Sequence, residues 1–294
     1  MKRTGFLAVM GRPNVGKSTL VNRMVGQKVA IVSPKPQTTR GRILGIRTEG
    51  EDQYVFIDTP GIFAGQNPLG QYMVRTARSA VNDCDGAILV ADAGFDPGDI
   101  ERGLIGAFRK AGIPAVLALN KIDRILRERL AQTIAAYAAL HSFAAVVPVC
   151  AKSGKGVDEL LEECGQLLHE GDWIFEEDMM TDQSARQMAA EIIREKILRT
   201  VNREVPHGIA VVIEAFDEEP QLTSIRAEIF CEKESHKGIL VGKNGETLKR
   251  IGSYARDDLE RLLGTQVYLN LWVKVKENWR ESLKDLRSFG YGEI

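Results

Sequence analysis

The stretch Gly11-Arg12-Pro13-Asn14-Val15-Gly16-Lys17-Ser18 decides the fold of this chain. It matches the pattern G-x-x-x-x-G-K-[ST] at every fixed position. The two glycines let the backbone turn its N–H groups onto phosphate oxygens without interference from a Cβ atom. Lys17 places a positive charge on the outer phosphates, and Ser18 offers a hydroxyl group to Mg²⁺. The stretch therefore predicts a phosphate-binding loop that leads into a helix over about 18–25.

Short apolar runs surround this loop, and each run ends in polar or glycine-rich residues before a helix-like segment. The runs are residues 6–10, 54–57, 87–90, 115–119 and 145–149. This alternation is typical of a mostly parallel sheet with helices on both faces. Residues 43–46 and 54–57 flank a polar turn, which predicts a hairpin and one antiparallel edge. Ligands of such sheets bind where the strands end, so we expect the chemistry there.

Two further motifs lie at such strand ends. Asp58-Thr59-Pro60-Gly61 offers a carboxylate that can hold Mg²⁺ through water and a flexible glycine N–H that can reach a γ-phosphate. Asn120-Lys121-Ile122-Asp123 follows the apolar run 115–119. The Asp123 carboxylate can accept two hydrogen bonds from the N1–H and the amino group of guanine, a paired donor edge that adenine lacks. The motifs together predict a guanine-nucleotide site.

In their order and placement these motifs resemble the translation-factor-like GTPases of the Ras-like fold. The resemblance implies a first switch at Gln37-Thr38-Thr39-Arg40-Gly41, where Thr39 joins Ser18 and Asp58 around Mg²⁺. It also implies that Cys150-Ala151-Lys152 supports the base, with Cys150 at a position where serine is usual. The GTP contacts that it implies are Gly11, Arg12, Pro13, Asn14, Val15, Gly16, Lys17, Ser18, Asp58, Thr59, Pro60, Gly61, Ile62, Asn120, Lys121, Ile122, Asp123, Cys150, Ala151 and Lys152.

The residue after Gly61 bears on hydrolysis. Ras-like proteins orient the attacking water with a glutamine there, whereas this chain has Ile62, which cannot orient water. We therefore expect slow conversion of GTP and water to GDP and phosphate by the protein alone, with Lys17, Thr39, Gly61 and Asn14 as the catalytic group. One hypothesis is that Asn14 helps to bind a monovalent cation such as K⁺ beside the phosphates. The alternatives are that a partner completes the site and that Asn14 is an ordinary loop residue.

The alternation ends near Gly171, and a different pattern follows an acidic stretch. We predict a GTPase domain over 1–171, a linker over 172–183 and a second domain over 184–294. In the second domain, residues 184–201 read as a helix, 209–216 and 224–231 as strands, and 267–275 as a final alternating strand. The fold class is thus an α/β P-loop domain with a mixed, mostly parallel sheet, followed by an α+β domain.

Within this second domain, Gly242-Lys243-Asn244-Gly245 stands between an apolar segment and an amphipathic helix. With the order α-β-β-α-α-β it resembles a KH domain of type II topology. The resemblance implies that the glycine loop meets nucleotide phosphates and that a neighbouring apolar groove holds about four unpaired bases. The region has few aromatic residues, which argues against an RRM-type stacking sheet. The RNA-binding residues expected are Lys237, Gly242, Lys243, Asn244, Gly245, Lys249 and Arg250.

A GTPase domain followed by a C-terminal KH domain is similar to the Era family of bacterial GTPases. That resemblance implies binding of small-subunit (16S) ribosomal RNA near its 3′ end, with GTP or GDP and the 30S subunit as partners in ribosome assembly. It also implies partial peripheral contact with the inner membrane. A different class of function stays open, namely a membrane- or cell-cycle-linked signalling GTPase whose KH-like domain binds protein.

The composition of the chain limits which of these functions and locations are possible. The chain has 294 residues, with 39 Lys+Arg against 40 Asp+Glu and a formal net charge of −1. Binding of nucleic acid by bulk charge is excluded, so RNA contact must use a local patch. The cysteines Cys84, Cys150, Cys164 and Cys231 form no C-x-x-C pair, which favours a reducing, cytoplasmic location. No apolar run approaches the length of a membrane span, and we expect a monomer.

Overall fold

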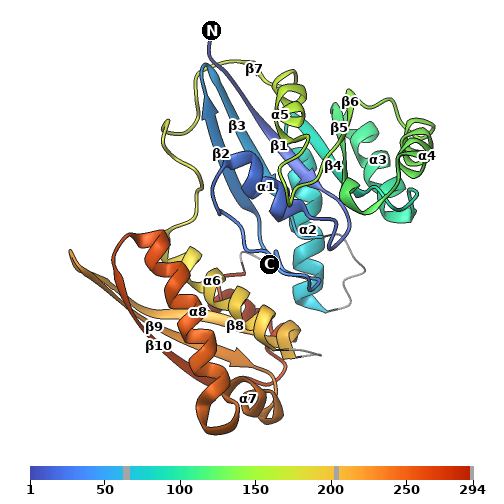
Figure 1. Ribbon diagram of the computed structural model, residues 1–294. Helices are drawn as coiled ribbons and strands as arrows, with labels where there is room; N and C mark the ends of the chain where they lie inside the picture. Colours follow the sequence, from blue (N-terminus) through green and yellow to red (C-terminus); the bar gives the residue numbers. More distant parts are fainter. Residues whose placement is uncertain (62–66, 202–204, 292–294) are drawn as a thin grey trace. The chain divides into compact units, whose positions relative to one another are not determined.

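The computed structural model describes residues 1–61, 67–201 and 205–291, and they form two compact units (Figure 1). The first unit holds the described residues of Met1–Ala30, Thr39–Gly65 and Gly70–Asp182. The second holds those of Ile31–Thr38, Gln66–Leu69 and Gln183–Ile294. The stretch 31–38 therefore packs with the C-terminal part of the chain, although it precedes Thr39 of the expected switch.

The first unit is built on one mixed sheet with strand order β2-β3-β1-β4-β5-β6. Only the neighbours β2 and β3 in this order are antiparallel, as the predicted hairpin requires. A further short strand, β7, pairs antiparallel with β1. The fold class predicted for this part of the chain is confirmed. The strands are β1 (Arg3–Met10), β2 (Ile43–Glu49), β3 (Asp52–Asp58), β4 (Gly86–Asp92), β5 (Ala115–Asn120), β6 (Ala145–Pro148) and β7 (His169–Glu170).

Apolar side chains cover both faces of this sheet. Alternation along β1 sends Leu7 and Val9 into one core and Ala8 and Met10 into the other. Helices α1 and α5 complete the first core, while α2, α3 and α4 complete the second. The strands thus read as continuous apolar runs, because they are buried on both sides. The helices are α1 (Lys17–Val25), α2 (Pro68–Asn82), α3 (Asp99–Ala111), α4 (Arg127–Ala138) and α5 (Val157–Gly165), with a 3₁₀ turn η1 (Ile122–Arg124).

The acidic segment after β7 runs along the hairpin of the first unit. The side-chain amide of Gln53 accepts from the backbone N–H groups of Ile174 and Phe175 at 2.9 and 3.0 Å, and donates to the Phe175 carbonyl at 2.9 Å. On the outer edge of β2, the Ile46 N–H donates to the Met180 carbonyl at 2.8 Å. These contacts give the open edge of β2 a backbone partner, as an edge strand needs.

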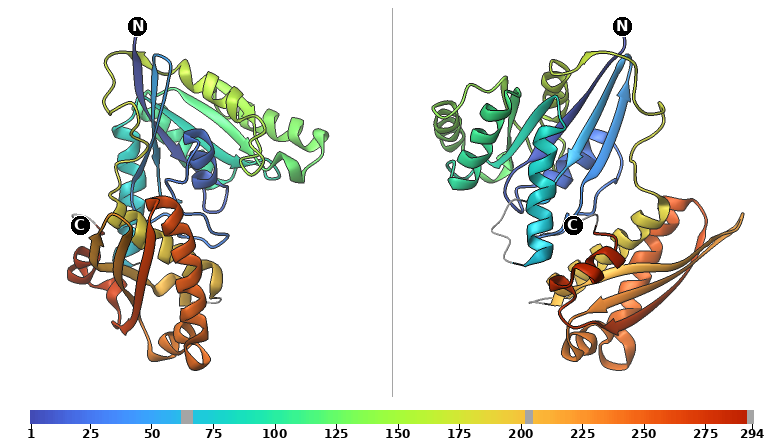
Figure 2. Two further views of the ribbon diagram at one scale, coloured as in Figure 1. Left: turned by 60° about the vertical axis from the view of Figure 1, so that its left-hand side comes forward. Right: turned by 180° about the vertical axis from the view of Figure 1, so that it is seen from behind.

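The second unit has a three-stranded sheet, β10-β9-β8, in which β9 pairs antiparallel with β8 and parallel with β10. Helices α6 and α8 pack on one face over a core that includes Ile193, Ile225 and Ile251, and Figure 2 gives further views. This is the predicted KH arrangement. The elements are α6 (Ala185–Thr200), η2 (Val205–Gly208), β8 (Ala210–Glu218), β9 (Leu222–Cys231), α7 (Glu234–Val241), η3 (Lys243–Gly245), α8 (Glu246–Leu263), β10 (Gln266–Val275), η4 (Trp279–Glu281) and α9 (Leu283–Ser288).

The segment before the glycine loop is a helix, as the predicted order α-β-β-α-α-β requires, but it begins earlier than the apolar residues that mark it. The sequence indicated a short apolar stretch after Lys237, whereas the structure has the helix α7 from Glu234. Gly238 weakens the helical signal there, and burial of Leu240 in the core supplies the missing stabilisation. In the part of the chain that is described, every helix is too short or too polar to cross a membrane.

Candidate functional site

The phosphate loop joins β1 to α1, and its two fixed glycines occupy positions that other residues would disturb. Gly11 has φ +151°, and a Cβ atom there would lie 2.2 Å from the Val90 carbonyl oxygen. Gly16 has φ +102°, and a Cβ atom there would lie 2.4 Å from Asn120 Nδ2. A left-handed backbone is inexpensive only for glycine. Both fixed glycines of the motif are therefore required by packing as well as by phosphate chemistry.

Three side-chain oxygens meet at the start of α1. The Ser18 hydroxyl lies 2.7 Å from Asp58 Oδ2 and 2.9 Å from Thr39 Oγ1, and Thr39 Oγ1 lies 3.4 Å from the same carboxylate oxygen. Asp58 Oδ1 is buried and accepts no hydrogen bond from the described residues. This set suits Mg²⁺, which takes oxygen ligands. When bound, the ion neutralises charge that develops on the phosphate oxygens.

Lys17 is held ready for an anion. Its ammonium group donates to the carbonyls of Gly11 and Arg12, each at 3.1 Å, and its side chain is almost fully buried. Burial lowers the pKa of Lys17 to about 8, against the attraction of Asp58. Burial likewise raises the pKa of Asp58. Placing phosphates beside Lys17 would offset the cost of burying its charge.

The base-recognition motif is tied to the phosphate loop through one amide. Asn120 Nδ2 donates to the Val15 carbonyl at 2.7 Å, and Asn120 Oδ1 accepts from the backbone of Lys121 and Ala151 at 2.8 and 3.0 Å. Asn120 therefore fixes three loops from one buried position. Lys121 adds a second link, because its ammonium group donates to the Asn14 carbonyl at 2.7 Å and pairs with Asp92 at 2.9 Å.

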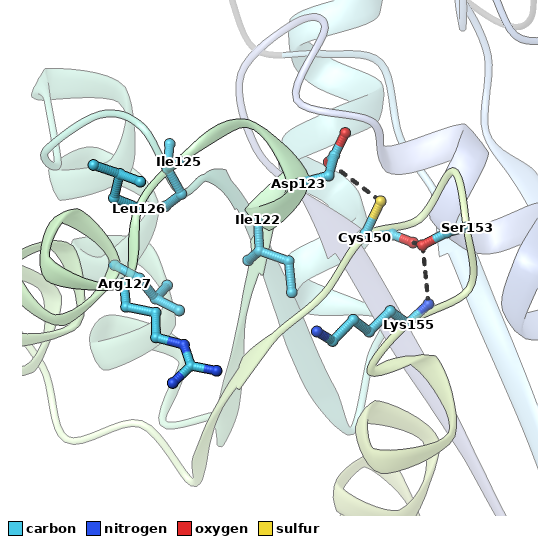
Figure 3. Close-up of a pocket in the computed structure, with 9 residues that line it drawn as sticks. Ile122, Asp123, Ile125, Leu126, Arg127, Cys150, Ser153 and Lys155 are labelled. Carbon is cyan, nitrogen blue, oxygen red and sulfur yellow. Dashed lines mark hydrogen bonds between the residues drawn. The ribbon is translucent and has the colours of Figure 1, made fainter.

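Asp123 projects from the turn after β5, and the thiol of Cys150 donates to its Oδ1 atom at 3.2 Å (Figure 3). This hydrogen bond is the main reason why the pKa of Asp123 is lowered. The carboxylate is therefore ionised and oriented, as an acceptor for paired N–H donors must be. Cys150 thus takes over the orienting role that a serine hydroxyl would have. A cavity of about 390 Å³ adjoins this pair and is lined in part by Leu126, Leu130 and Lys155.

In the second unit, the glycine loop connects α7 to α8. Gly242 has φ +75°, and a Cβ atom there would lie 2.3 Å from Thr247 Oγ1. Asn244 and Gly245 are also left-handed, with φ 52° and 80°. The N-cap residue Gly245 supplies no capping side chain, and the Glu246 N–H donates to the Lys243 carbonyl. The next N–H groups of the first turn are therefore the ones that an anion can reach. Lys243, Lys249 and Arg250 are exposed around this end, whereas Lys237 is half-buried.

Comparisons with known proteins cover the whole chain. A family model described as "50S ribosome-binding GTPase" matches residues 6–121, and a KH domain model matches 204–280. GTPase Era of Syntrophus aciditrophicus is 48% identical over 297 residues, with 100% of this chain and 96% of the relative covered. GTPase Era of Ruminiclostridium cellulolyticum is 46% identical over 290 residues, with 98% and 97% covered. The chain belongs to the Era family of GTPases.

Solved structures of Era agree with this. A variant of Aquifex aeolicus Era bound to GDP·AlF₄⁻ has a TM-score of 0.96 at 38% identity, covering 99% of this chain and 100% of its own. Era in complex with MgGDPNP and nucleotides 1506–1542 of 16S ribosomal RNA has a TM-score of 0.94 at 37% identity, with 100% of both chains covered. This Era-family chain is therefore a GTPase.

The structure brings the residues predicted from sequence together in three groups. Ser18, Thr39 and Asp58 meet at the phosphate end, Asn120 and Asp123 at the base end with Cys150 and Ala151, and the glycine loop stands in the other unit. Gly61 lies against the phosphate loop, where a Cβ atom would be 2.8 Å from Pro13 Cα. Ile62 lies outside the described residues. The roles assigned to these residues stay predictions.

Sequence reasoning missed one partner of the phosphate loop. Arg12 Nε donates to Glu101 Oε1 at 2.5 Å, and a second guanidinium nitrogen pairs with Glu101 Oε2. Glu101 lies in the first turn of α3 and is buried, and it also accepts from the Gly98 N–H at 3.0 Å. A charged residue inside an amphipathic helix carries no signal that distinguishes such a contact from a solvent-exposed one.

A second contact that sequence reasoning missed holds the stretch 31–38 on α6, within the second unit. The buried carboxylate of Glu195 accepts from the Val32 N–H at 2.9 Å, and Arg199 donates to the Val32 carbonyl at 2.9 and 3.1 Å. Arg194, also buried, donates to the Thr38 carbonyl. The next residue is Thr39, whose hydroxyl belongs to the group that suits Mg²⁺.

Proposed function

We propose that this GTPase binds small-subunit ribosomal RNA near its 3′ end and acts in the assembly of the 30S subunit. The observation that carries the proposal is the glycine loop at the uncapped N-terminus of α8, in the same chain as a guanine-nucleotide site. Further support comes from the relative, 37% identical over the full length, that was crystallised with MgGDPNP and nucleotides 1506–1542 of 16S ribosomal RNA.

The proposed RNA contact uses backbone groups and mobile cations in place of a rigid pocket. Lys243 and the first N–H groups of α8 meet phosphates, and Lys249 and Arg250 add electrostatic attraction. Ile239, 48% exposed, offers apolar surface just before the loop. KH domains clamp about four unpaired nucleotides between such a loop and an apolar groove. Single-stranded RNA is therefore the substrate class that this loop suits.

We also propose that GTP binding is coupled to RNA binding through the stretch 31–38. Glu195, Arg199 and Arg194 hold this stretch on α6, which is part of the RNA-binding unit. Thr39 continues from it into the group that contacts nucleotide and Mg²⁺. Because γ-phosphate contacts order such switch segments, the nucleotide state would bias how this stretch rests on α6. By linkage, RNA must then affect GTP affinity by the same factor.

The test is a titration of single-stranded 16S 3′-end RNA with a GTP analogue, with GDP and without nucleotide. Lys243→Glu is expected to weaken RNA binding roughly tenfold or more, because it replaces a phosphate partner by a like charge. Lys284→Glu, the same exchange at an exposed position of α9, is the matched control and should have little effect. Absence of RNA binding in every nucleotide state would contradict the proposal and favour the reading in which the KH domain binds protein.

The coupling has a separate readout. Arg199→Ala removes two hydrogen bonds to Val32 while leaving the glycine loop intact. The ratio of RNA affinities in the GTP and GDP states should move toward one, with RNA affinity in the absence of nucleotide unchanged. An unchanged ratio in this variant would show that the stretch 31–38 plays no part in the coupling.

For hydrolysis we propose that Asn14 helps to bind a monovalent cation beside the phosphates. The backbone of Asn14 is left-handed, with φ 63°, and its carbonyl accepts a hydrogen bond from Lys121. The exposed side chain of Asn14 therefore extends from a backbone position that is fixed. Turnover should be faster in potassium than in sodium buffer, and Asn14→Ala should remove the difference. Equal turnover of the unmodified protein in both buffers would overturn this idea and favour completion of the site by a partner.

A further inference from the structure

Among the described residues, helices α6 and α8 cover one face of the three-stranded sheet of the second unit, and the part of the opposite face around β10 lies under no helix. Residues 267, 269 and 271 of β10 point into the core with α8, so the alternate positions Tyr268, Asn270 and Trp272 point away from it. Tyr268 is 57% exposed and Trp272 is 62% exposed. Two large aromatic rings thus stand on one row of a strand, about 13 Å apart at the usual rise per residue.

Another aromatic residue of this face has a different environment. Phe230 of β9 packs against Phe289 with ring centroids 4.6 Å apart, and Phe289 in turn contacts Trp279 at 5.4 Å. The C-terminal segment therefore covers the end of the sheet face at Phe230. Tyr268 and Trp272 have no such cover from the described residues, and each stays more than half exposed. The sequence predicts few aromatic stacking platforms here, whereas two of the three tryptophans of the chain lie in this unit and one of them, Trp272, stands with Tyr268 on an open surface.

Polar groups that suit nucleotides lie between the two rings. Asn270 is the register partner of Arg226 on β9, so the exposed guanidinium lies beside the row midway between Tyr268 and Trp272. Within the described residues Arg226 makes no ion pair, whereas the nearby carboxylate of Glu228 is already paired with Lys274. The surface therefore offers two stacking rings, an amide that can donate and accept, and a cation available to a phosphate.

We propose that this surface, formed by Tyr268, Asn270, Trp272 and Arg226, is a second binding site for single-stranded RNA. Bases would stack on the two rings while Arg226 meets the backbone, as on the aromatic sheets and grooves that bind unpaired nucleic acid. The inference rests on the proposed function, because the occupant is the continuation of the RNA held at the glycine loop.

Continuity of the two surfaces through β10 favours RNA over a protein partner. Leu271 of β10 faces α8, where a Cβ atom on Gly252 would lie 3.5 Å from it, and α8 begins at the glycine loop. Trp272 is the next residue and points to the opposite face. β10 is also an edge strand of its sheet. A single strand that passes over this edge would therefore leave the groove and meet Trp272 without crossing another element of the sheet.

The test compares two RNAs of the 16S 3′-end sequence, one of about four nucleotides that fills only the groove and one several times longer. Trp272→Ala should weaken binding of the longer RNA roughly 5- to 100-fold, the range for loss of one stacked base, and leave the short RNA unaffected. Trp272→Phe keeps a ring and should restore most of the affinity. Phe95→Ala, which removes an aromatic residue of similar exposure (62%) from the first unit, is the matched control.

The outcomes separate this proposal from the proposed function. If the unmodified protein binds neither RNA, the proposed function fails. If it binds both but Trp272→Ala and Tyr268→Ala leave the affinity of the longer RNA unchanged, the second site is overturned while the first stands. An equal loss for both RNAs also overturns it, because the surface would then act through the groove or the fold. A change in self-association with unchanged RNA affinity would assign the face to a protein contact.

Discussion

At the nucleotide site of the first unit, Lys17 and Asp58 are buried and each meets fixed partners, whereas at the glycine loop of the second unit Lys243 and Asn244 lie exposed. The first site recognises one small ligand through oriented side chains. The second offers backbone groups, cations and rings along a surface that a flexible chain can follow. The contrast teaches that nucleotide affinity at the first site should fall steeply after small changes of geometry. RNA affinity at the second site should change gradually with the charge and the contact area of the surface.

The largest effect is expected from Asp123→Asn, which breaks the site at its most specific contact. The variant loses the carboxylate that accepts both guanine donors, so GTP affinity should fall roughly 100-fold or more. Titration with a fluorescent guanine nucleotide measures the loss. RNA affinity without nucleotide should not change, and a GTP affinity close to that of the unmodified protein would contradict the assignment of Asp123.

A smaller but clear effect is expected from Gly16→Ala. The added Cβ atom would approach Asn120 Nδ2 to 2.4 Å at a φ of +102°, disturbing the amide that joins three loops. Strain of about 1–3 kcal/mol should weaken nucleotide binding roughly 5- to 100-fold. Gly26→Ala is the matched control, since φ is +86° there but no atom lies within 4 Å. Equal losses in the two variants would mean that strain alone, without Asn120, governs the effect.

At the second unit we expect a graded response to charge. Lys249→Ala and Arg250→Ala should each lower RNA affinity only a few-fold and reduce the slope of log affinity against log salt by about 0.7. Lys284→Ala on α9 is the control of equal charge. If the slope stays the same in both variants, these two side chains do not contact RNA phosphates.

The smallest effect is expected at Cys150. Cys150→Ala removes the hydrogen bond to Asp123 and should weaken GTP binding by a factor of about three to ten, because a thiol is a weak donor to a charged acceptor. Cys150→Ser should bind at least as tightly as the unmodified protein, since a hydroxyl is the stronger donor. Tighter binding by the alanine variant would refute the orienting role.

The same contrast explains how far the sequence could predict the molecule. The motifs at Gly11, Asp58 and Asn120 were predictable because their chemistry requires particular residues at the ends of strands. The start of helix α7 at Glu234 was not, because packing of Leu240 outweighs the weak local preference around Gly238. The row Tyr268, Asn270 and Trp272 was readable from the same alternation that placed residues 267, 269 and 271 inside. The sequence could not show that, among the described residues, no helix lies over this row of the sheet.

Contacts between distant segments were beyond sequence reasoning. Glu195 and Arg199 resemble an ordinary pair one helical turn apart, and nothing in their spacing indicates that both also hold Val32. The contact of Glu101 with Arg12 could not be predicted for the same reason. The partners of such residues are distant in the sequence and come close only when the chain folds.

The acidic segment 171–182, which Gln53 holds along the hairpin, has a consequence for synthesis of the protein. All strands of the first sheet have been synthesised once residue 170 is made, yet the outer edge of β2 still lacks the carbonyl of Met180 that pairs with Ile46. At about 5–20 residues per second, that interval lasts on the order of a second. During it the nascent chain exposes an open strand edge, the feature that invites wrong pairing between chains. The segment 171–182 thus completes the edge of the sheet last during synthesis, as well as covering it in the folded domain.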